Sequence, residues 1–204
     1  MQNLIFLSKH KIMKHIVIFF LSLGLSFSAF GQETWLVDNP HSNLRFEVGW
    51  EDFSMRTGEF KVFEGTMVTN SREDLTDASI EFIVDATSVN VIADRLAEHV
   101  KSDKFLNVEK HPQIKFTSNK ATKMDDGTYT STGKLTIHGM EKDQEVTFKV
   151  TGKKETKKGF IYGLQVSLTV NRMDYGLDWG SPRLAENIIL VGHLLFKLKT
   201  EDEE

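Results

Sequence analysis

Apolar and polar residues alternate one by one along most of the chain after residue 32. Leu44, Phe46, Val48 and Trp50 alternate with mostly polar neighbours, and a period of two is typical of a strand with one buried face. The same period recurs over residues 80–84, 114–118, 146–150 and 164–170. Strands are also predicted over residues 60–67, 129–137 and 188–199, which brings the expected number to about eight.

Turn signals separate these segments at Asn39-Pro40, Asp125-Asp126-Gly127 and Lys157-Lys158-Gly159. Links of hairpin length join neighbouring strands in antiparallel order. An open sheet of about eight such strands has two exposed edges, and closure into a barrel removes both. The pattern therefore predicts an all-β fold with one short helix. The expected architecture is an eight-stranded antiparallel β-barrel, with a two-sheet sandwich of the same strands as the alternative.

One segment has a helical period instead. Ile92, Leu96 and Val100 recur at every fourth position, which predicts an amphipathic helix of about three turns with Asn90 as its N-cap. The strand segment 188–191 is apolar on both faces, and such a strand needs a second layer outside the core. The helix is expected either to supply that layer or to cap one mouth of the barrel.

The interior of an eight-stranded barrel is just wide enough for side chains or for one slender ligand. The predicted inward positions are all apolar: Phe46, Val48, Phe60, Phe82, Phe116, Phe148, Leu168 and Leu190. From the residues alone two interpretations stay open, because deep pockets are few in any protein. These side chains either fill the core or line a tunnel.

The N-terminus has the pattern of a secretory signal peptide. Lys9, Lys11 and Lys14 precede the apolar run 16–25, and small residues follow shortly before Gln32. The run is shorter than the roughly 20 apolar residues that span a membrane. Residues 1–31 are therefore predicted to be a signal peptide cleaved before Gln32, and the mature protein is expected to be periplasmic or secreted.

Composition indicates a single acidic domain over residues 32–200, followed by an acidic tail over 201–204. Removal of the three lysines of the signal peptide from the 25 basic residues leaves 22, against 29 acidic residues, a net charge of −7. This balance argues against nucleic acid or an anionic membrane surface as the main partner. Cysteine is absent, so no disulfide stabilises the fold and the core must do so alone.

Residues with the spacing of known catalytic or metal sites are missing from the sequence. The chain has no Cys nucleophile and no G-x-S-x-G elbow. The mature histidines are not spaced as metal ligands: His41, His99, His111, His138 and His193. The sequence therefore predicts no catalytic residue and no metal ligand, and hence a protein that is not an enzyme.

Several segments in order form a recognisable series: Trp35–Asp38 with His41–Phe46; Arg56–Phe60 with Phe63–Gly65; Asp85–Val89 with Arg95, His99, Ser102, Asp103, Phe105–Val108, Pro112, Ile114 and Phe116–Ser118; Gly133–Gly139; and Arg172–Leu177. Their order and spacing resemble the YceI-like family of exported, lipocalin-like proteins, over residues 35 to about 196. The segment 140–145 departs from the family by being longer and more charged, which suggests a different turn after Gly139.

The resemblance implies a lipocalin-like, eight-stranded barrel with a helix, enclosing a tunnel for an isoprenoid-type lipid such as a quinone or a polyprenyl chain. It implies binding, carriage or storage of that lipid without catalysis and with no other cofactor. Transient membrane contact and a homodimer are both compatible with it. A ligand-free barrel acting as a protein-interaction or stress-response module is the alternative, and an enzyme acting on an isoprenoid lipid is less favoured.

The resemblance also singles out four polar residues as candidates at a barrel mouth. Arg95 and His99 are i, i+4 neighbours on one helical face and can meet the same partner. Arg172 and Asp174 are expected to share a strand face at i, i+2, where they could pair. Such groups would either bind a quinone carbonyl or phosphate head group, or hold the helix and a corner turn in place.

Overall fold

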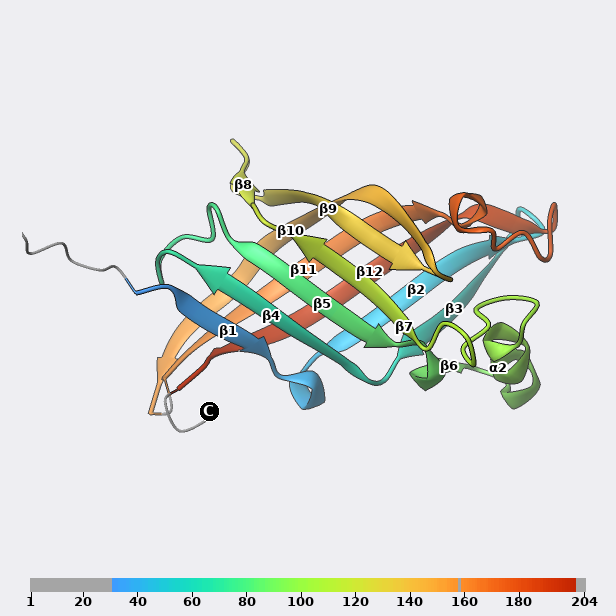
Figure 1. Ribbon diagram of the computed structural model, residues 1–204, viewed down its shortest axis with the longest axis horizontal. Coiled ribbons are helices and arrows are strands. Elements are labelled where there is room, and N and C mark those ends of the chain that lie inside the picture. Colours follow the sequence, from blue (N-terminus) through green and yellow to red (C-terminus); the bar gives the residue numbers. More distant parts are fainter. Residues whose placement is uncertain (1–30, 158, 201–204) are drawn as a thin grey trace, which may run out of the picture. The chain divides into compact units, whose positions relative to one another are not determined.

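The computed structural model describes residues 31–157 and 159–200, and Figure 1 shows their arrangement. None of the helices in these residues is long and apolar enough to cross a membrane. The strands are β1 (Glu33–Val37), β2 (Asn43–Trp50), β3 (Ser54–Phe60), β4 (Phe63–Thr69), β5 (Ser79–Asp85), β6 (Val89–Val91), β7 (Gln113–Ser118), β8 (Thr122–Lys123), β9 (Tyr129–Ile137), β10 (Met140–Thr156), β11 (Gly159–Asn171) and β12 (Leu184–Leu198). The helices are the α-helix α2 (Asp94–Lys101) and the 3-10 helices η1 (Asn39–His41), η2 (Ala86–Ser88) and η3 (Arg172–Tyr175).

The strands close into a barrel, as predicted, and do not form a sandwich. The antiparallel order β1-β4-β5-β7-β9-β10-β11-β12 returns to β1, so eight strands complete the ring. At the seam, Trp35 of β1 lies opposite Leu198 of β12 on one side and Met67 of β4 on the other. Every strand of this ring therefore has a partner on both sides, and no sheet edge is left open there.

Three of the barrel strands are interrupted halfway along their length. The helix η1, which contains Pro40, separates β1 from β2; Lys61 and Val62 separate β3 from β4; and η2 separates β5 from β6. The predicted strand 60–67 is thus two strands. Beyond these interruptions the order is β12-β2-β3-β6, and β6 is the last strand of that row. Helix α2 follows β6 and packs against it (Figure 1).

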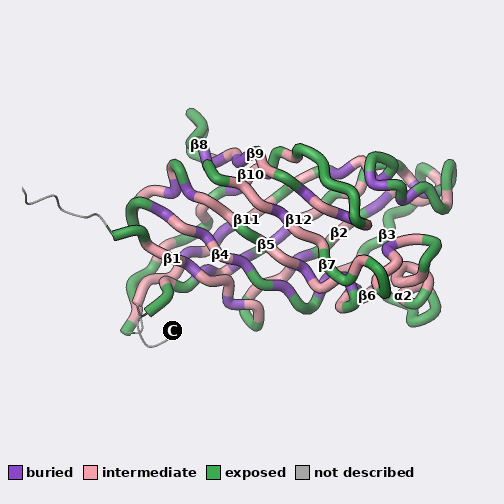
Figure 2. The backbone as a smooth tube through the Cα atoms, viewed as in Figure 1, coloured by how far each residue is buried: buried purple, intermediate pink, exposed green. Residues whose placement is uncertain are grey.

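The predicted alternation decides which side chains are buried. Figure 2 shows buried positions spaced along the strands between exposed ones. In β4, for example, Phe63, Gly65 and Met67 are buried, whereas the residues between them are not. Aromatic pairs fill the interior: Trp35 meets Tyr162 edge-on at 4.8 Å, and Tyr129 stacks on Phe148 at 5.3 Å.

The turn after β9 is shorter than predicted. His138 and Gly139 both have positive φ angles, 51° and 73°, as a two-residue hairpin turn of type I′ requires. Ile137 consequently pairs directly with Met140, the first residue of β10. The charged segment 140–145, expected to form a modified turn, lies within β10 instead.

The helix is also shorter than predicted and begins later. It spans the eight residues of α2, and its N-cap residue Ala93 makes no side-chain capping bond. Asn90, the predicted N-cap, lies in β6 and donates a hydrogen bond to Glu59 at 3.0 Å. Ile92 precedes the helix and is 97% exposed. Helix α2 does not cover the outer face of β12, where Ile189 is 39% exposed, so capping the barrel mouth is the correct alternative.

Candidate functional site

Two apolar cavities lie end to end inside the barrel. The inner cavity has a volume of about 130 Å³ and the outer cavity a volume of about 750 Å³. Four residues line both of them: Ile114, Ile137, Val170 and Leu190. The two cavities therefore share part of their wall, and together they follow the interior of the barrel.

The inner cavity is lined only by aliphatic, aromatic and methionine side chains among the residues the structure describes. Five of the predicted tunnel residues are part of this lining: Phe82, Phe116, Phe148, Leu168 and Leu190. A polar group placed among them would lose its hydrogen bonds to water without replacement. This end of the interior can therefore accept hydrocarbon but not a polar head group.

The remaining predicted tunnel residues, Phe46, Val48 and Phe60, line the outer cavity, and Leu190 lines both cavities. All eight predicted residues thus lie in the wall of one cavity or the other, although their binding of a lipid remains a prediction. Trp50, Met55 and Trp179 also line the outer cavity and were not predicted. Trp50 ends a clearly alternating strand and could have been included. Trp179 follows η3 in a segment without periodicity, and no pattern of residues there points to a cavity wall.

Helix α2 forms one wall of the outer cavity and brings two of the predicted mouth residues to it. Arg95 and His99 both line this cavity, together with Leu96 and Val100 from the same helix. The His99 ring packs against the Trp179 ring with centroids 4.0 Å apart. Its Nε2 atom is buried and has no hydrogen-bond partner among the described residues. An unpartnered buried nitrogen in a cavity wall is a ready contact for a ligand.

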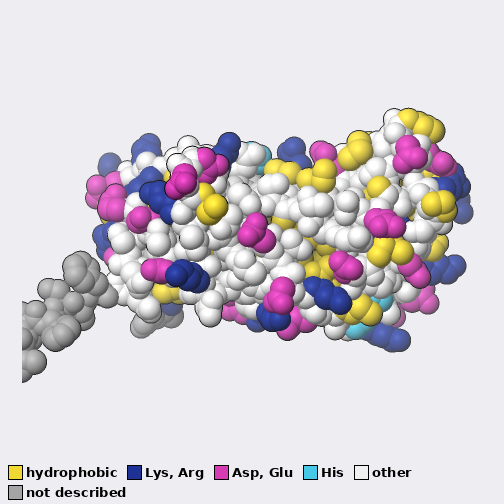
Figure 3. Space-filling view, turned by 90° about the horizontal axis from the view of Figure 1, so that it is seen from above, with side chains coloured by type: hydrophobic (Ala, Val, Ile, Leu, Met, Phe, Trp, Pro, Cys, Tyr) yellow, Lys and Arg dark blue, Asp and Glu magenta, His cyan; other side chains and the backbone are white. Residues whose placement is uncertain are grey.

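The mouth of the outer cavity lies at the end of the barrel that carries α2. Three large apolar side chains of its lining are exposed there: Ile92 is 97% exposed, Met55 53% and Trp179 38%. Phe53, in the turn between β2 and β3, is also 87% exposed. Figure 3 shows exposed hydrophobic side chains gathered mainly over the right-hand half of the molecule, the half that holds α2 in Figure 1. Access to the interior is therefore from this end.

The prediction that Arg172 and Asp174 share a strand face is wrong. Both lie in η3, Arg172 is completely buried, and Asp174 is exposed and lines neither cavity. No ion pair joins the two within the described part of the chain. The buried guanidinium instead donates to five acceptors in the loop that follows and at the start of β12: the carbonyls of Leu177, Trp179 (3.1 Å), Leu184 (2.8 Å) and Ala185 (2.8 Å), and the hydroxyl of Ser181 (2.9 Å).

Arg172 consequently serves as a clamp for the loop 177–185 at the mouth. A guanidinium carries five N–H donors, and here each one is occupied by the protein. Burial lowers the pKa of this guanidinium from its ordinary value. Arg172 lines the outer cavity, but it has no donor left for a ligand. Of the two interpretations of this residue, the structural one fits the geometry.

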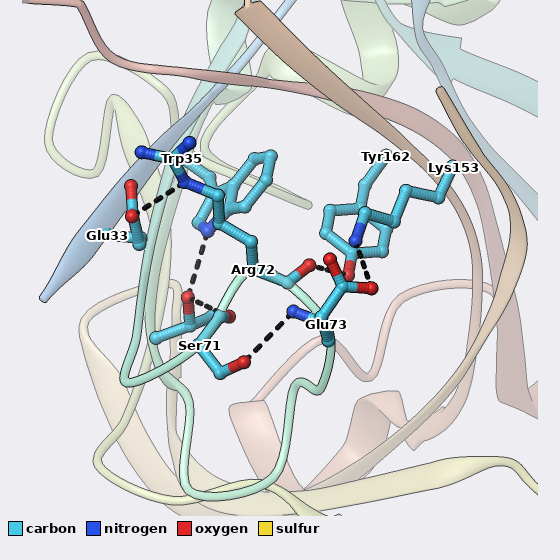
Figure 4. Close-up of polar contacts among 8 residues, drawn as sticks. Glu33, Trp35, Ser71, Arg72, Glu73, Lys153 and Tyr162 are labelled. Carbon is cyan, nitrogen blue, oxygen red and sulfur yellow. Dashed lines mark hydrogen bonds and ion pairs between the residues drawn. The ribbon is translucent and has the colours of Figure 1, made fainter. Parts of the chain in front are cut away.

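The opposite end of the barrel is closed by a polar network, drawn in Figure 4. The Trp35 indole donates to Thr69 at 3.0 Å, and the Tyr162 hydroxyl donates to the carbonyl of Arg72.

Two ion pairs hold the loop 70–78 against the strands beside it: Arg72 with Glu33 at 2.7 Å, and Lys153 with Glu73 at 2.6 Å. Burial, and then the charge of Glu73, raise the pKa of Tyr162 to about 12.

The described residues offer no metal site beside the cavities. No three His, Cys, Asp or Glu side chains of residues 31–157 and 159–200 lie close enough together to hold a metal ion. The cavity pair is therefore the feature of the described chain with the geometry of a ligand site.

Sequence comparison finds relatives across most of the chain. A UPF0312 protein of Pectobacterium atrosepticum is 28% identical over 155 residues, which is 76% of this chain and 80% of that protein. A UPF0312 protein of Yersinia enterocolitica is 26% identical over 141 residues, which is 69% of this chain and 72% of the relative.

Solved structures from Burkholderia cenocepacia and Saccharophagus degradans have the same fold. Burkholderia cenocepacia BcnA matches with a TM-score of 0.70 at 19% identity, covering 78% of this chain and 98% of BcnA. A polyisoprenoid binding domain from Saccharophagus degradans matches with a TM-score of 0.61 at 15% identity, over 81% of this chain and 98% of that domain. The model of the YceI-like domain matches residues 35–195, and the chain therefore belongs to the YceI-like family.

Proposed function

We propose that the protein binds an isoprenoid-type lipid, a quinone or a polyprenyl chain, and carries or stores it without chemical change. The observation that best supports this proposal is the pair of apolar cavities that share a wall and open at one end of the barrel. In this arrangement the hydrocarbon chain lies along the interior, with its end in the inner cavity. The head group stays at the mouth, because the inner cavity has no polar side chain to receive it.

The size of the outer cavity favours a bound ligand over a filled barrel. Sites for small molecules have volumes of about 300–1,000 Å³, and the outer cavity of about 750 Å³ falls within that range. The polyisoprenoid binding domain from Saccharophagus degradans, which has the same fold, supports an isoprenoid as the ligand class. Apolar walls distinguish chain lengths by only about 1–3 kcal/mol per methylene, so related isoprenoids would also bind.

The lining residues support binding in preference to catalysis. The polar side chains in the wall of the outer cavity are Arg56, Thr57, Arg95, His99 and Arg172. This described lining contains no carboxylate that could be paired with His99 as an acid–base couple. Membership of the YceI-like family points in the same direction.

Export is part of the proposal. The predicted signal peptide falls almost wholly on residues 1–30, which lie outside the described residues, as does the acidic tail 201–204. A periplasmic or secreted location rests on the basic residues and the apolar run of the sequence. N-terminal sequencing of protein from the extracytoplasmic fraction should begin at or near Gln32, and recovery of the intact N-terminus in the cytosol would contradict export.

Mass spectrometry of an organic extract tests the ligand class directly. Protein purified without detergent should release an isoprenoid lipid on extraction, in amounts approaching one lipid per protein. Delipidated protein should then take up an added polyprenyl lipid of similar length. Protein that carries no lipid and takes up none would favour the ligand-free interaction module instead.

A further inference from the structure

We infer that the mouth of the outer cavity selects lipids with an anionic head group, so that an isoprenoid phosphate binds more tightly than the uncharged alcohol or quinone of the same chain. This inference rests on the proposed function and specifies its ligand further.

The charges in the wall of the outer cavity are all of one sign. Arg56, Arg95 and Arg172 line it, His99 lies beside them, and no Asp or Glu is among its described lining residues. The whole chain, by contrast, has 29 acidic and 25 basic residues and is net negative. A cluster of cations at one cavity mouth is therefore a local feature that the overall composition would not produce. A cleft lined by one sign of charge attracts the opposite sign.

Two of these arginines are free to act on a ligand. Neither Arg56 nor Arg95 forms an ion pair with any residue in the described part of the chain, and both are exposed. Arg56 stacks over the Trp50 ring at 5.2 Å. Arg183 stacks over the same ring at 4.8 Å but also pairs with Glu51. The charge of Arg183 is thus neutralised by the protein, whereas the charges of Arg56 and Arg95 are not.

His99 and Arg172 add to the same preference in different ways. The buried Nε2 of His99 has no partner, and in the tautomer or charge state that places a proton there it can donate to a head-group oxygen. His99 and Arg95 are one helical turn apart on α2, so both can approach the same group. Arg172 has no free donor, and it forms no direct ion pair within the described chain; Glu186 and Asp178 act on its charge only from a distance, so part of that positive charge is left to the cavity.

The chemistry of these groups fits phosphate better than a carbonyl or hydroxyl. Guanidinium groups bind phosphate oxygens through two parallel, charge-assisted hydrogen bonds, which are about twice as strong as neutral ones. A quinone carbonyl or an alcohol offers no charge to the two unpaired guanidinium groups. Asp94 and Asp178 lie next to Arg95 and Trp179 in the sequence, but neither lines the cavity.

A pair of lipids with the same chain tests the inference. Delipidated full-length mature protein is titrated with a polyprenyl monophosphate and with the corresponding polyprenol, and both Kd values are measured by displacement of a fluorescent fatty acid. We expect the phosphate to bind at least about tenfold more tightly at low salt. This ratio should fall as ionic strength rises, because the mouth is exposed to solvent.

Variants assign the preference to named residues. The double variant Arg56→Gln/Arg95→Gln should bring the ratio of the two Kd values close to one. Arg45→Gln, an exposed arginine of β2 that lines neither cavity, is the matched control and should leave both Kd values unchanged. Melting curves of both variants show whether each remains folded.

The outcomes separate this inference from the function on which it rests. Equal binding of phosphate and alcohol by the parent protein would overturn the anionic preference and leave isoprenoid binding intact. A preference that survives in the double variant would overturn its assignment to the mouth arginines. Failure to bind either lipid would overturn the proposed function itself.

Discussion

At the closed end of the barrel polar side chains bind one another, whereas at the mouth several have no protein partner. Arg72 and Lys153 are paired with carboxylates at the closed end, and Tyr162 donates to a backbone carbonyl. At the mouth, Arg95 is unpaired within the described chain and Nε2 of His99 is buried without a partner. The polar side chains without a protein partner thus lie at the end of the barrel that is open to solvent.

The two ends differ because the barrel strands are interrupted between them. In the half that contains β1, β4 and β5 the strands form an unbroken ring. In the other half the row ends at β6, and helix α2 stands where a further strand pairing would be. In a closed ring the backbone hydrogen bonds of every strand are made within the sheet, and a loop is enough to cover the end of the barrel. A row of strands that ends beside a helix leaves room for a cavity. The same alternating pattern of residues is therefore compatible with a covered end of the barrel and with a candidate ligand site at the other end.

The largest expected effect is that of a charge in the inner cavity. Phe82→Asp should lower the free energy of unfolding by about 4 kcal/mol or more, because it removes a large apolar side chain and buries an unpaired carboxylate. It should also abolish lipid uptake. Urea denaturation and lipid extraction measure the two effects.

Ile83→Asp is the matched control for that variant. Ile83 is the next residue of β5 and points to the opposite face. It lies between Lys115 on β7, which attracts the new carboxylate, and Glu64 on β4, which repels it, so the two cross-strand effects offset each other. Its substitution should cost no more than about 1 kcal/mol. Equal losses in the two variants would show that the inner cavity is no more apolar than the outer surface.

Removal of the mouth clamp should have the next largest effect. Arg172→Leu leaves the carbonyls of the loop 177–185 without donors, and we expect a loss of about 3 kcal/mol. For a domain of this size the melting temperature should fall by roughly 6–12 °C. Asp174→Asn alters an exposed residue of the same 3-10 helix and should change the melting temperature by less than about 1 °C. A similar fall in both variants would contradict the clamp.

A single hydrogen bond at the closed end is expected to contribute less. Tyr162→Phe should cost about 1 kcal/mol, without a change in lipid affinity, because Tyr162 lines neither cavity. The pKa of Tyr162 is raised to about 12 from its ordinary value of 10. Its contribution to stability is therefore complete below pH 10 and is lost as the pH rises from about 10 to 12.

Melting curves between pH 9 and pH 12 check the sign of this effect. The parent protein should lose stability over that range, and Tyr162→Phe should lose less of it. The parallel variant Tyr129→Phe removes a hydroxyl that donates to Asp74 at 2.9 Å and serves as the control. If Tyr162→Phe and the parent have the same alkaline slope, the Tyr162 hydroxyl does not titrate in the folded state as we expect.

The smallest effect on stability is expected for Arg95. The side chain is exposed and has no ion pair in the described part of the chain, so Arg95→Ala should melt within about 1 °C of the parent. The affinity for a polyprenyl phosphate should nevertheless fall about tenfold. A fall of several degrees without any loss of affinity would make Arg95 a structural contact, like Arg172, and would extend the clamp to the helix.

The alternating pattern was sufficient to predict the barrel because period two depends only on neighbouring residues. It placed Phe46 and Phe82 in the cavity walls for the same reason. It could not predict where a strand is interrupted, since Lys61 and Val62 differ little from strand residues and the break is set by pairing with distant strands. The helix was predicted too long because Ile92 matches the apolar period, although it lies before the helix and faces solvent.

Arg172 was misplaced for a related reason. Its spacing from Asp174 suggested a strand, but Asn171 accepts a hydrogen bond from the backbone of Met173 at 2.9 Å and starts a 3-10 turn there. The acceptors that surround Arg172 come from a loop without periodicity, and only the folded chain brings them together. A buried arginine is rare enough that exposure is the usual expectation from sequence.

The seam between β1 and β12 has a consequence for the order of folding. Trp35 pairs opposite Leu198, so the ring is completed by contacts between residues roughly 160 positions apart. Pairings of such high contact order form late and slowly. Until the last strand is available, β1 and β11 both present unpaired edges that can recruit other chains. A nascent or truncated chain that stops before β12 begins at Leu184 would therefore be prone to aggregation unless a chaperone covers these strand edges.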